Sequence, residues 1–504
     1  MEFLLLLLAA GAILAALVIS RFSTGLSRRY HPVVGTFLHQ LVHFRRLYDY
    51  HTELSHRHKS FRILITPFKS IIYTSDPALV EHVLRSSFHN YGKGQRNYEN
   101  LKDLLGDGIF VVDGSKWRHQ RKLFSYEFST RSLREHSGAV FKKNAAKLAA
   151  AVSKSAVNSH QAIEMQDYFF KSAMDSIFEI AFGTELNYLQ GSSEENSRFI
   201  TALDDANMQI NKRYTNPFWK LMKIFNIGTE AALIENVKVV DDYVYKLIHT
   251  KVVKMSSTRQ TNETTVEKED ILSRFLRESE RDPENMSIQY LRDIVLNFVV
   301  AGKDTTGGTL AWFLYMLCKH PSVQEKIALE IKQAVRADED ARFQDFAANI
   351  TEESLEKMQY LHATLNETLR LYPALPLDPK VCFSDDKLPD GFDIRKGEII
   401  VYQPYCMGRM KYLWGEDAED FRPERWLDEN GVICLENPFK FTAFQAGPRI
   451  CLGKEFAYRQ MKIFSTVLLR FFRFQLRDEK ESINYRMNLT LMVDQGIYLR
   501  VFER

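Results

Sequence analysis

Helical periodicity over most of the chain limits what this 504-residue sequence can fold into. From Pro77 to about residue 375, apolar residues recur mainly at helical spacing, and only the polar stretch Ser256–Asp270 is predicted to be a surface loop, because it cannot bury a face. Strands are predicted near the two ends, as one hairpin of Phe61–Ile65 with Ser70–Tyr73 and another of Met487–Val493 with Ile497–Phe502. The pattern predicts a mainly α fold with a small β portion.

Composition and charge exclude several classes of protein. With 45% hydrophobic and 26% charged residues, the chain is ordinary globular rather than collagen-like, low-complexity or disordered. Its formal net charge of +3 is too small for a surface that tracks nucleic acid or anionic lipid as a whole, so any basic partner face is local. The five cysteines are scattered and form no C-x-x-C pair, which favours a reducing compartment over a disulfide framework.

A run of 17 uncharged apolar residues, Phe3–Ile19, predicts a membrane segment near the N-terminus. A cleaved signal peptide has a positive start and a shorter apolar core, whereas this run follows Glu2, so an uncleaved anchor is favoured over cleavage. Arg21, Arg28 and Arg29 follow the run, and cationic flanks stay in the cytosol. We therefore predict an anchor over residues 1–20, a linker over residues 21–36 and a cytosolic domain over residues 37–504.

The segment Phe444–Gly453, FQAGPRICLG, presents a single cysteine in a glycine loop at the start of a predicted helix. The positive end of the helix dipole and its unpaired amides favour the thiolate of Cys451, which is the form that ligates metal. Gly447 and Gly453 permit a conformation or a close approach that a side chain would prevent. Arg449 can pair with an acidic group of a cofactor. The alternative is a buried, inert cysteine, which is the commoner role of a lone cysteine.

This loop resembles, at every defining position, the haem-binding signature of the cytochrome P-450 family. The resemblance implies that Cys451 is the axial thiolate ligand of a haem b iron, which favours cleavage of the O–O bond. It also assigns Phe444, Gly447, Arg449 and Gly453 to haem binding. The implied fold is the cytochrome P-450 fold, one large, mainly α-helical domain with a small β portion, here preceded by a single N-terminal membrane anchor.

Long helices are predicted over Ser287–Lys319, with Ser287 as its N-cap, and over Leu452–Phe472. The middle of the first, AGKDTTGG, places three glycines inside a helix, at a cost of about 1 kcal/mol each relative to alanine. That conflict is typical of a functional site, and a kink made for packing is the equal alternative. By resemblance this is the oxygen-binding helix of the family, in which Asp304 and Thr305 take the acid and alcohol positions of the proton relay. Ala301 and Gly302 then face the haem, with Gly302 opening a groove for dioxygen.

Two further motifs extend the resemblance. Glu367 and Arg370 lie at i, i+3 on a helix and could form only a surface salt bridge. Together with Arg425 they resemble the buried Glu–Arg–Arg triad of the family, which implies a structural role around the haem. Trp117 and Arg121 could be an ordinary cation and aromatic pair at i, i+4. By resemblance they hydrogen-bond a haem propionate, with Arg449 assisting.

Substrate class rests on a resemblance to the plant group that hydroxylates fatty acids at the ω carbon, which is carried by Tyr30–Thr36, Leu47–Tyr50, Gly106–Phe110 and Ala374–Lys380. It implies a long-chain fatty acid with its carboxylate outward and a product used in polymers such as cutin, suberin or sporopollenin. Lys303 fits that group. Animal ω-hydroxylases esterify haem through a Glu where this chain has Ala301, so no covalent haem link is expected. By analogy with the family, the pocket candidates, each of which could equally be core, are Tyr98, Leu101, Phe110, Phe298, Leu375, Leu377, Met492 and Val493.

Two other functions stay open. One is the same monooxygenation of a terpenoid, a steroid or another specialised metabolite, which shares every motif above. The other is a haem protein that rearranges fatty hydroperoxides or binds a ligand without activating dioxygen. The Asp304–Thr305 pair favours the monooxygenases, because a peroxide substrate already contains the O–O bond and needs no proton relay.

Electrons must come from a partner, because the chain has no G-x-G-x-x-G fingerprint followed by a suitable acid. The family expectation is a membrane-bound flavoprotein reductase, through which NADPH is used indirectly. Arg118, Lys122 and Lys454 could form its docking patch, although a solvated face is an equal alternative. With the anchor, these expectations place the protein on the endoplasmic reticulum membrane, with the catalytic domain facing the cytosol and with no nucleic acid partner.

Overall fold

The computed structural model of the protein describes residues 31–32, 40, 42–66, 69–129, 131–156, 162–260, 270–283, 286–479 and 483–504. The apolar run Phe3–Ile19 and most of the linker predicted over residues 21–36 lie outside these residues. Within the described part of the chain, no helix has both the length and the apolar character needed to cross a bilayer.

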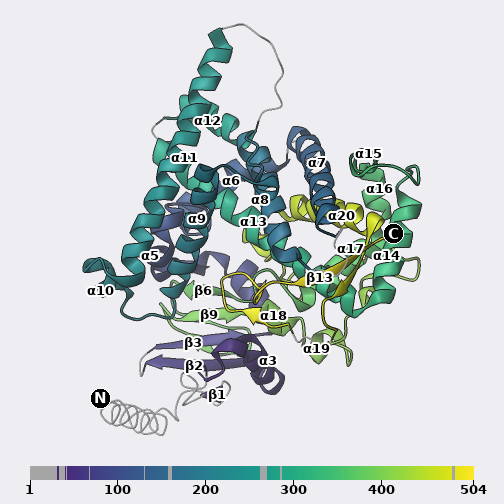
Figure 1. Cartoon of the computed structure of the whole chain (residues 1–504). Helices are drawn as coiled ribbons and strands as arrows, with labels where there is room; N and C mark the ends of the chain where they lie inside the picture. The colour runs from purple at the N-terminus through teal and green to yellow at the C-terminus, as the bar shows by residue number, and fades with distance from the viewer. Residues whose placement is uncertain are drawn as a thin grey trace.

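Helices dominate the described chain, as the periodicity predicts (Figure 1). They are α3 (Leu47–Arg57), α4 (Pro77–Glu81), α5 (Gly94–Leu105), α6 (Gly114–Ser129), α7 (Arg131–Ala156), α8 (Met165–Phe182), α9 (Glu194–Lys212), α10 (Trp219–Ile224), α11 (Gly228–Gln260), α12 (Ile271–Arg281), α13 (Ile288–Lys319), α14 (Pro321–Ala334), α15 (Phe343–Ala348), α16 (Glu352–Lys357), α17 (Gln359–Leu371), α18 (Pro404–Met407), α19 (Lys411–Trp414) and α20 (Lys454–Phe471). Helix α13 begins where predicted, because the Ser287 side chain accepts a hydrogen bond from the Tyr290 N–H, and α20 lies within the predicted range.

Within the residues that the structure describes, the strands form four sheets. They are β1 (His31–Pro32), β2 (Ser60–Thr66), β3 (Lys69–Thr74), β4 (Tyr91–Gly92), β5 (Ile163–Glu164), β6 (Asp378–Cys382), β7 (Asp386–Lys387), β8 (Asp393–Ile394), β9 (Ile399–Tyr402), β10 (Phe472–Leu476), β11 (Tyr485–Arg486), β12 (Met492–Val493) and β13 (Tyr498–Glu503). The largest sheet has the order β1-β2-β3-β9-β6-β4 and lies below the helical body in Figure 1. Its β2 and β3 pair antiparallel, which confirms the first predicted hairpin.

Two predictions near the polar and C-terminal segments were wrong. Strand β12 does not pair with the strand that follows it, because β12 pairs with β11, whereas β13 pairs with β10 and β5. The turn residue Gly496 has φ +81°, so the chain does reverse there, but the two strands that flank it belong to different sheets. The predicted loop Ser256–Asp270 is partly helical, since α11 continues to Gln260 and the Asp270 side chain caps α12.

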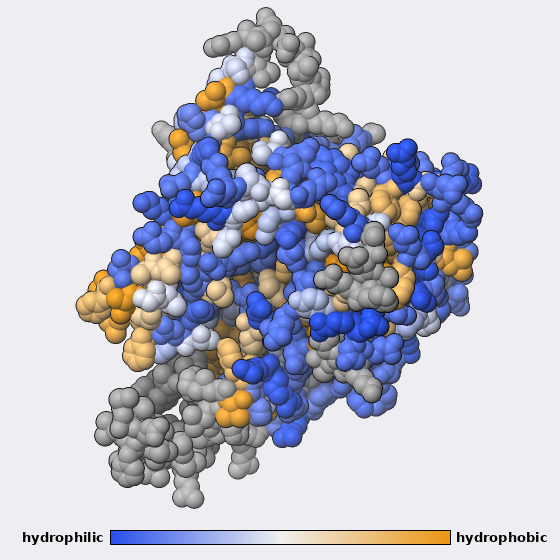
Figure 2. Space-filling model, viewed as in Figure 1, coloured by the Kyte–Doolittle hydropathy of each residue, from blue (hydrophilic) through white to orange (hydrophobic). Residues whose placement is uncertain are grey.

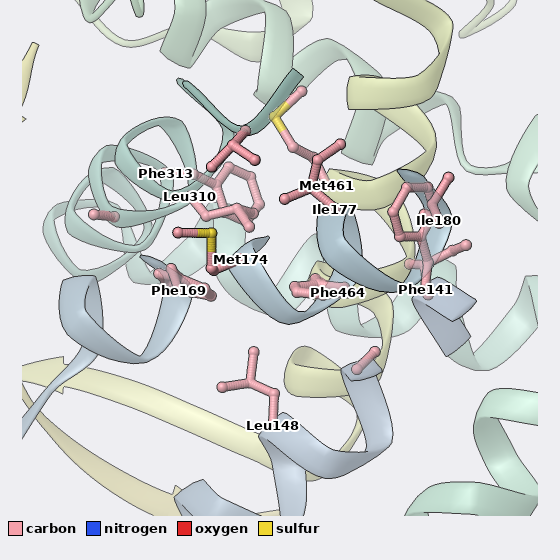
Figure 3. Packing of buried hydrophobic residues seen from close by; sticks show 14 of the residues in the cluster. Phe141, Leu148, Phe169, Met174, Ile177, Ile180, Leu310, Phe313, Met461 and Phe464 are labelled. Atoms are coloured by element: carbon pink, nitrogen blue, oxygen red, sulfur yellow. The ribbon is translucent and has the colours of Figure 1, made fainter. Parts of the chain in front are cut away.

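The core around the centre of the molecule is built by α7, α8, α13 and α20 (Figure 3). Each fully buried large side chain stabilises the fold by roughly 1.5–3 kcal/mol. The side chains that meet there are Phe141 and Leu148 of α7, Phe169, Met174, Ile177 and Ile180 of α8, Leu310 and Phe313 of α13, and Met461 and Phe464 of α20. This packing fixes the middle of α13 relative to the start of α20, where the cysteine loop lies.

Candidate active site

The cysteine loop is held in one shape by its backbone. The Cys451 N–H donates to the Phe444 carbonyl at 2.8 Å, which closes the loop before α20 begins. Gly447 has φ +66°, and a Cβ there would lie 2.0 Å from the Leu84 carbonyl oxygen, so only glycine fits. The Phe444 ring packs 5.0 Å from the Tyr458 ring of α20. The loop therefore presents Cys451 at a fixed place.

The Cys451 side chain is exposed, yet burial among surrounding protein atoms raises the pKa of its thiol. Both observations hold for a sulfur that lies deep in the fold and faces open space. The Gly453 N–H, Arg121 and Lys454 each lower the pKa, but burial outweighs them. The Gly453 N–H at the helix start therefore acts in the direction that the sequence predicts, and the role of Cys451 as a thiolate ligand stays a prediction.

Arg449, Trp117 and Arg121 gather at this loop, as the sequence predicts for a propionate site. The Arg449 guanidinium lies 4.4 Å from the centre of the Trp117 ring. Arg121 donates to the Ile450 carbonyl at 2.5 Å, and burial lowers the pKa of Arg121 while Cys451 raises it. Arg449 also donates to Asp113 at 2.6 Å. Asp113 was not singled out from the sequence, although an aspartate directly before a helix is a recognisable capping signal.

A second group that the sequence did not reveal lies beside Arg449. Buried Asp378 accepts hydrogen bonds from Lys93 at 2.9 Å, Lys380 at 2.7 Å and the Tyr402 hydroxyl at 2.8 Å. Burial lowers the pKa of Lys380 to about 7, with Lys93 and Arg449 adding to the effect and Asp378 opposing it. One carboxylate thus holds two lysines near Arg449.

These residues fit an anionic, metal-containing cofactor of the haem type. The Nε atom of Arg449 is buried and has no hydrogen-bond partner among the described residues. A buried guanidinium donor without a partner is costly, and a haem propionate would satisfy it. A thiol that is fixed in position and faces open space is a suitable axial ligand. Cys451 therefore suits the iron of a haem, and Arg449 suits its propionates.

The middle of α13 presents one incompletely covered face. Ala301, Gly302 and Thr305 are partly exposed, whereas Lys303, Asp304 and the stretch 306–314 are buried. The Thr305 hydroxyl donates to the Ala301 carbonyl at 2.6 Å. A Cβ on Gly302 would lie 2.9 Å from Ile177 of α8, so this glycine allows close packing of the two helices. That contact gives Gly302 a packing reason, and its predicted role in a dioxygen groove stays a prediction.

Asp304 lies in a small charged cluster between α13 and α9. Its Oδ1 atom is 3.4 Å from Lys303 Nζ, and its Oδ2 atom accepts from Asn207 at 3.5 Å. Lys303 also makes a short ion pair with Asp204 of α9. The sequence pointed to Asp304 and Lys303, but it gave no sign of Asp204, which lies 99 residues away along the chain.

Glu367, Arg370 and Arg425 meet as the sequence predicts. Glu367 accepts from Arg370 at 2.7 and 2.8 Å and from Arg425 at 2.9 Å. The Trp426 indole, which the sequence did not single out, donates to Glu367 at 2.9 Å. The side chains of Glu367 and Arg370 are completely buried. Burial lowers the pKa of Arg370, and Glu367 opposes this effect.

The pocket candidates fall into two groups. Leu101, Phe298 and Val493 are buried, and Phe298 packs against the Phe124 and Phe128 rings in an aromatic cluster typical of core. The partly exposed or exposed candidates are Tyr98, Phe110, Leu375, Leu377 and Met492. The segment before Leu375 is joined to the segment before Met492, because the Leu491 N–H donates to the Ala374 carbonyl at 3.0 Å. The Trp312 indole of α13 donates to the Leu491 carbonyl at 2.9 Å, so these apolar segments converge beside α13.

The three predicted docking cations lie close to the site. Arg118 and Lys122 are exposed at i, i+4 on α6, and Lys454 is the first residue of α20. Lys454 is near enough to lower the pKa of Cys451. The three cations thus lie on the two helices that adjoin the cysteine loop, and their role in docking stays a prediction.

Comparison with known proteins gives consistent matches over the whole length. The sequence profile of the cytochrome P-450 family matches residues 27–501. Cytochrome P-450 704C1 of Pinus taeda is 48% identical, over 94% of this chain and 92% of its own. Cytochrome P-450 704B1 of Arabidopsis thaliana is 40% identical over 94% of each chain. Cytochrome P-450 94A1 of Vicia sativa is 36% identical, over 86% of this chain and 82% of its own.

Proposed function

Because the chain belongs to the cytochrome P-450 family, whose members are monooxygenases with a thiolate-ligated haem, we propose that it hydroxylates long-chain fatty acids at the ω carbon. The observation that carries the proposal is the junction of apolar segments beside α13, where Ala374, Leu491 and Trp312 are joined by hydrogen bonds. Leu375, Leu377 and Met492 lie within a few residues of that junction and are partly exposed. An apolar wall of this kind suits an alkyl chain, and the resemblance to plant fatty-acid ω-hydroxylases favours the same substrate.

Each site residue has one assigned task in this proposal. Cys451 ligates the iron, and Arg449, Arg121 and Trp117 bind the propionates beside the loop. When bound, the haem activates dioxygen with electrons from a partner protein, so that one oxygen atom enters a C–H bond. Buried Asp304 and partly exposed Thr305, which are neighbours on α13, move protons. Glu367, Arg370 and Arg425 hold the surrounding core and take no part in the chemistry.

The protein would work at a membrane, with its catalytic domain on the cytosolic side of the endoplasmic reticulum. Figure 2 shows hydrophobic residues gathered over α10 at the left of the molecule. Phe218, Leu221, Ile224, Phe225 and Ile227 are 52–74% exposed, which is unusual for large apolar side chains and suits contact with lipid. An NADPH-dependent flavoprotein reductase would dock at the cationic surface of Arg118, Lys122 and Lys454.

The substrate class is tested by titrating the purified, reductase-free protein with hexadecanoic and octadecanoic acids. Displacement of iron-bound water shifts the Soret band, so a saturable shift to the high-spin form is expected. If no chain length gives a shift while the carbon monoxide spectrum is that of a thiolate-ligated haem, the fatty-acid assignment is wrong. A terpenoid, a steroid or another specialised metabolite then becomes the substrate to test. Conversion of a fatty hydroperoxide without reductase would instead favour the rearrangement chemistry.

The ligand assignment is tested separately by Cys451→Ala, which should abolish the thiolate-type carbon monoxide spectrum. Cys434→Ala is the matched control, because Cys434 is also exposed but lies outside the cysteine loop. Retention of the thiolate spectrum in Cys451→Ala would contradict the assignment.

A further inference from the structure

Lys303 lies between two carboxylates that come from different helices. Its ammonium group makes a short hydrogen bond with Asp204 of α9 and lies 3.4 Å from Oδ1 of Asp304, its neighbour on α13. The Lys303 side chain is 8% exposed, whereas that of Asp204 is 48% exposed. The cluster therefore runs from solvent at α9 to the buried acid on α13.

Lys303 makes its shorter ion pair with Asp204 and its longer one with Asp304. Oδ1 of Asp304 is buried and accepts no hydrogen bond from any described residue, and Oδ2 receives only the long contact from Asn207. Besides the two carboxylates, the groups that face Lys303 are the Phe170 ring, 5.5 Å from its Nζ atom, and the Tyr188 side chain, whose pKa it lowers. Burial lowers the pKa of Lys303, but Asp304 and Asp204 outweigh it and raise the pKa, so the amine stays charged.

A buried ammonium group that stays charged must keep a carboxylate partner. If Asp204 is removed or moves away, the nearest replacement is Asp304, whose oxygen is already 3.4 Å away. A full ion pair with Lys303 would fix the Asp304 carboxylate in place. An acid fixed in this way is a poor proton carrier for Thr305.

We propose that Asp204 is a positioning residue that holds Lys303 away from Asp304 and thereby keeps Asp304 free to move protons. The proposal rests on the proposed relay of Asp304 and Thr305. Protons pass between the Asp304 carboxylate and the Thr305 hydroxyl, while Lys303 keeps all its protons and no electrons are transferred. Because Asp204 belongs to α9, the placement of α9 on α13 controls whether the acid is free.

The test is the variant Asp204→Asn, which keeps the shape of the side chain and removes its charge. With hexadecanoic acid, NADPH and the reductase, peroxide formed per NADPH should rise about tenfold, the change expected from one charge-assisted hydrogen bond of ordinary strength. In a crystal structure of this variant, Lys303 Nζ should lie within hydrogen-bond distance of the Asp304 carboxylate. Asp205→Asn, one residue further along the same helix, is the control and should leave both readouts unchanged.

The double variant Asp204→Asn with Lys303→Met separates positioning from a structural role. If Lys303 causes the defect, its removal should restore coupling, which is the share of NADPH electrons that end in hydroxylated product, to near the wild-type value. An equally uncoupled double variant would show that Asp204 only stabilises α9 and would overturn the proposal, as would normal coupling in Asp204→Asn. Asp204→Glu, which keeps the charge, should behave as wild type, and the carbon monoxide spectrum and thermal midpoint establish that each variant is folded.

Failure of the proposed function gives a different pattern. If the wild-type protein gives no product from hexadecanoic acid, the substrate assignment is wrong, and the crystallographic distance still decides the positioning role. If Thr305→Ala leaves coupling intact, the relay itself is wrong, and the proposal falls with it. A Lys303–Asp304 distance that stays at 3.4 Å or more in Asp204→Asn contradicts the positioning role alone.

Discussion

Two charged networks in the protein differ in how many of their carboxylate oxygens receive hydrogen bonds. In the network of Glu367, Arg370 and Arg425, Glu367 accepts five hydrogen bonds of 2.7–2.9 Å, from Arg370, Arg425, Trp426 and the Arg422 N–H. In the cluster of Asp204, Lys303 and Asp304, one carboxylate oxygen has no hydrogen bond from the described residues and one acid faces solvent. A completed network resists change, whereas the incomplete cluster is the one in which we propose that Asp304 carries protons.

The location of each network matches this difference. Arg370 also donates to the carbonyls of Gly408 and Asp420, so the first network joins α17 to the chain that leads into the cysteine loop. A Cβ on Gly408 would lie 1.9 Å from the Arg370 carbonyl oxygen, which shows how closely these segments pack. The second network joins α9 to α13, so its ion pairs depend on how these two helices are placed relative to each other. The first network is therefore expected to govern stability, and the second to govern coupling.

The largest effect is expected from Glu367→Gln, which leaves two buried guanidinium groups without their shared anion. Loss of one partner of a buried ion network costs about 3–5 kcal/mol. We expect the free energy of unfolding to fall by that amount and the haem to be lost, as measured by thermal unfolding and by the carbon monoxide spectrum. Glu424→Gln is the matched control, because Glu424 pairs with Lys326 at the surface and such pairs contribute about 0–1 kcal/mol. Equal losses of stability in the two variants would contradict the claim that the buried network stabilises the fold more than a surface ion pair does.

Thr305→Ala should affect the second network's function without affecting stability. Among the described residues, the Thr305 hydroxyl bonds only to the Ala301 carbonyl of its own helix, so its removal should leave the fold intact. We expect the haem spectrum to be retained and peroxide per NADPH to rise about tenfold or more, since a positioned proton carrier contributes at least that much. Thr309→Ala, one turn later with the same type of helix bond, is the control and should stay coupled. A fully coupled Thr305→Ala enzyme would remove Thr305 from the relay.

The two networks also differ in how far the sequence predicts them. The residues of the first network, the cysteine loop and the N-cap of α13 were predictable, because each belongs to a short motif with fixed spacing between its residues. Asp204 and Asp378 were not, since their partners Lys303 and Lys93 lie about 100 or more residues away and no motif links them. The C-terminal pairing was wrong because turn residues indicate where the chain reverses but not which strand it then meets, and β13 pairs with β10 and β5 rather than with β12. Distant contacts such as that of Arg449 with Trp117 were predicted where the family resemblance links their motifs, and distant contacts without a motif were not.

Arg425→Lys should damage the first network by a smaller amount. Arg425 donates to Glu367 at 2.9 Å and to the Asp417 carbonyl at 2.9 Å through a planar group that lysine cannot reproduce. The charge is kept but a carbonyl loses its partner, so we expect a loss of about 1–3 kcal/mol in the free energy of unfolding, with haem retained. Chemical denaturation of the variant measures this value. A loss as large as that of Glu367→Gln would mean that guanidinium geometry, rather than charge, holds the network.

The effect that is smallest near neutral pH is a pH dependence that reaches the first network through its helix. His362 lies on α17 with Glu367 and Arg370 and stacks on Tyr458 at 4.6 Å. Burial lowers the pKa of His362 to about 3, with Lys462 and Lys454 adding to the effect. As pH falls below about 6.5, the unfolded chain takes up a proton that the folded protein does not. The free energy of unfolding should therefore fall with decreasing pH, by up to about 1.4 kcal/mol per pH unit between the two pKa values, and be unaffected by this histidine at higher pH.

Replacement of His362 isolates this contribution. Between pH 6 and about 4, His362→Gln should reduce the slope of the unfolding free energy against pH by about 1.4 kcal/mol per pH unit, the value for one proton. Urea unfolding at a series of pH values measures this slope. His89→Gln, which changes an exposed histidine, is the control and should leave the slope as in wild type. If His362→Gln keeps the full slope, then another buried group sets the acid limit, and buried His51, whose pKa burial lowers to about 4, is the next to replace. His51 belongs to α3, so that result would move the acid-sensitive point away from the helix that carries the Glu367 network.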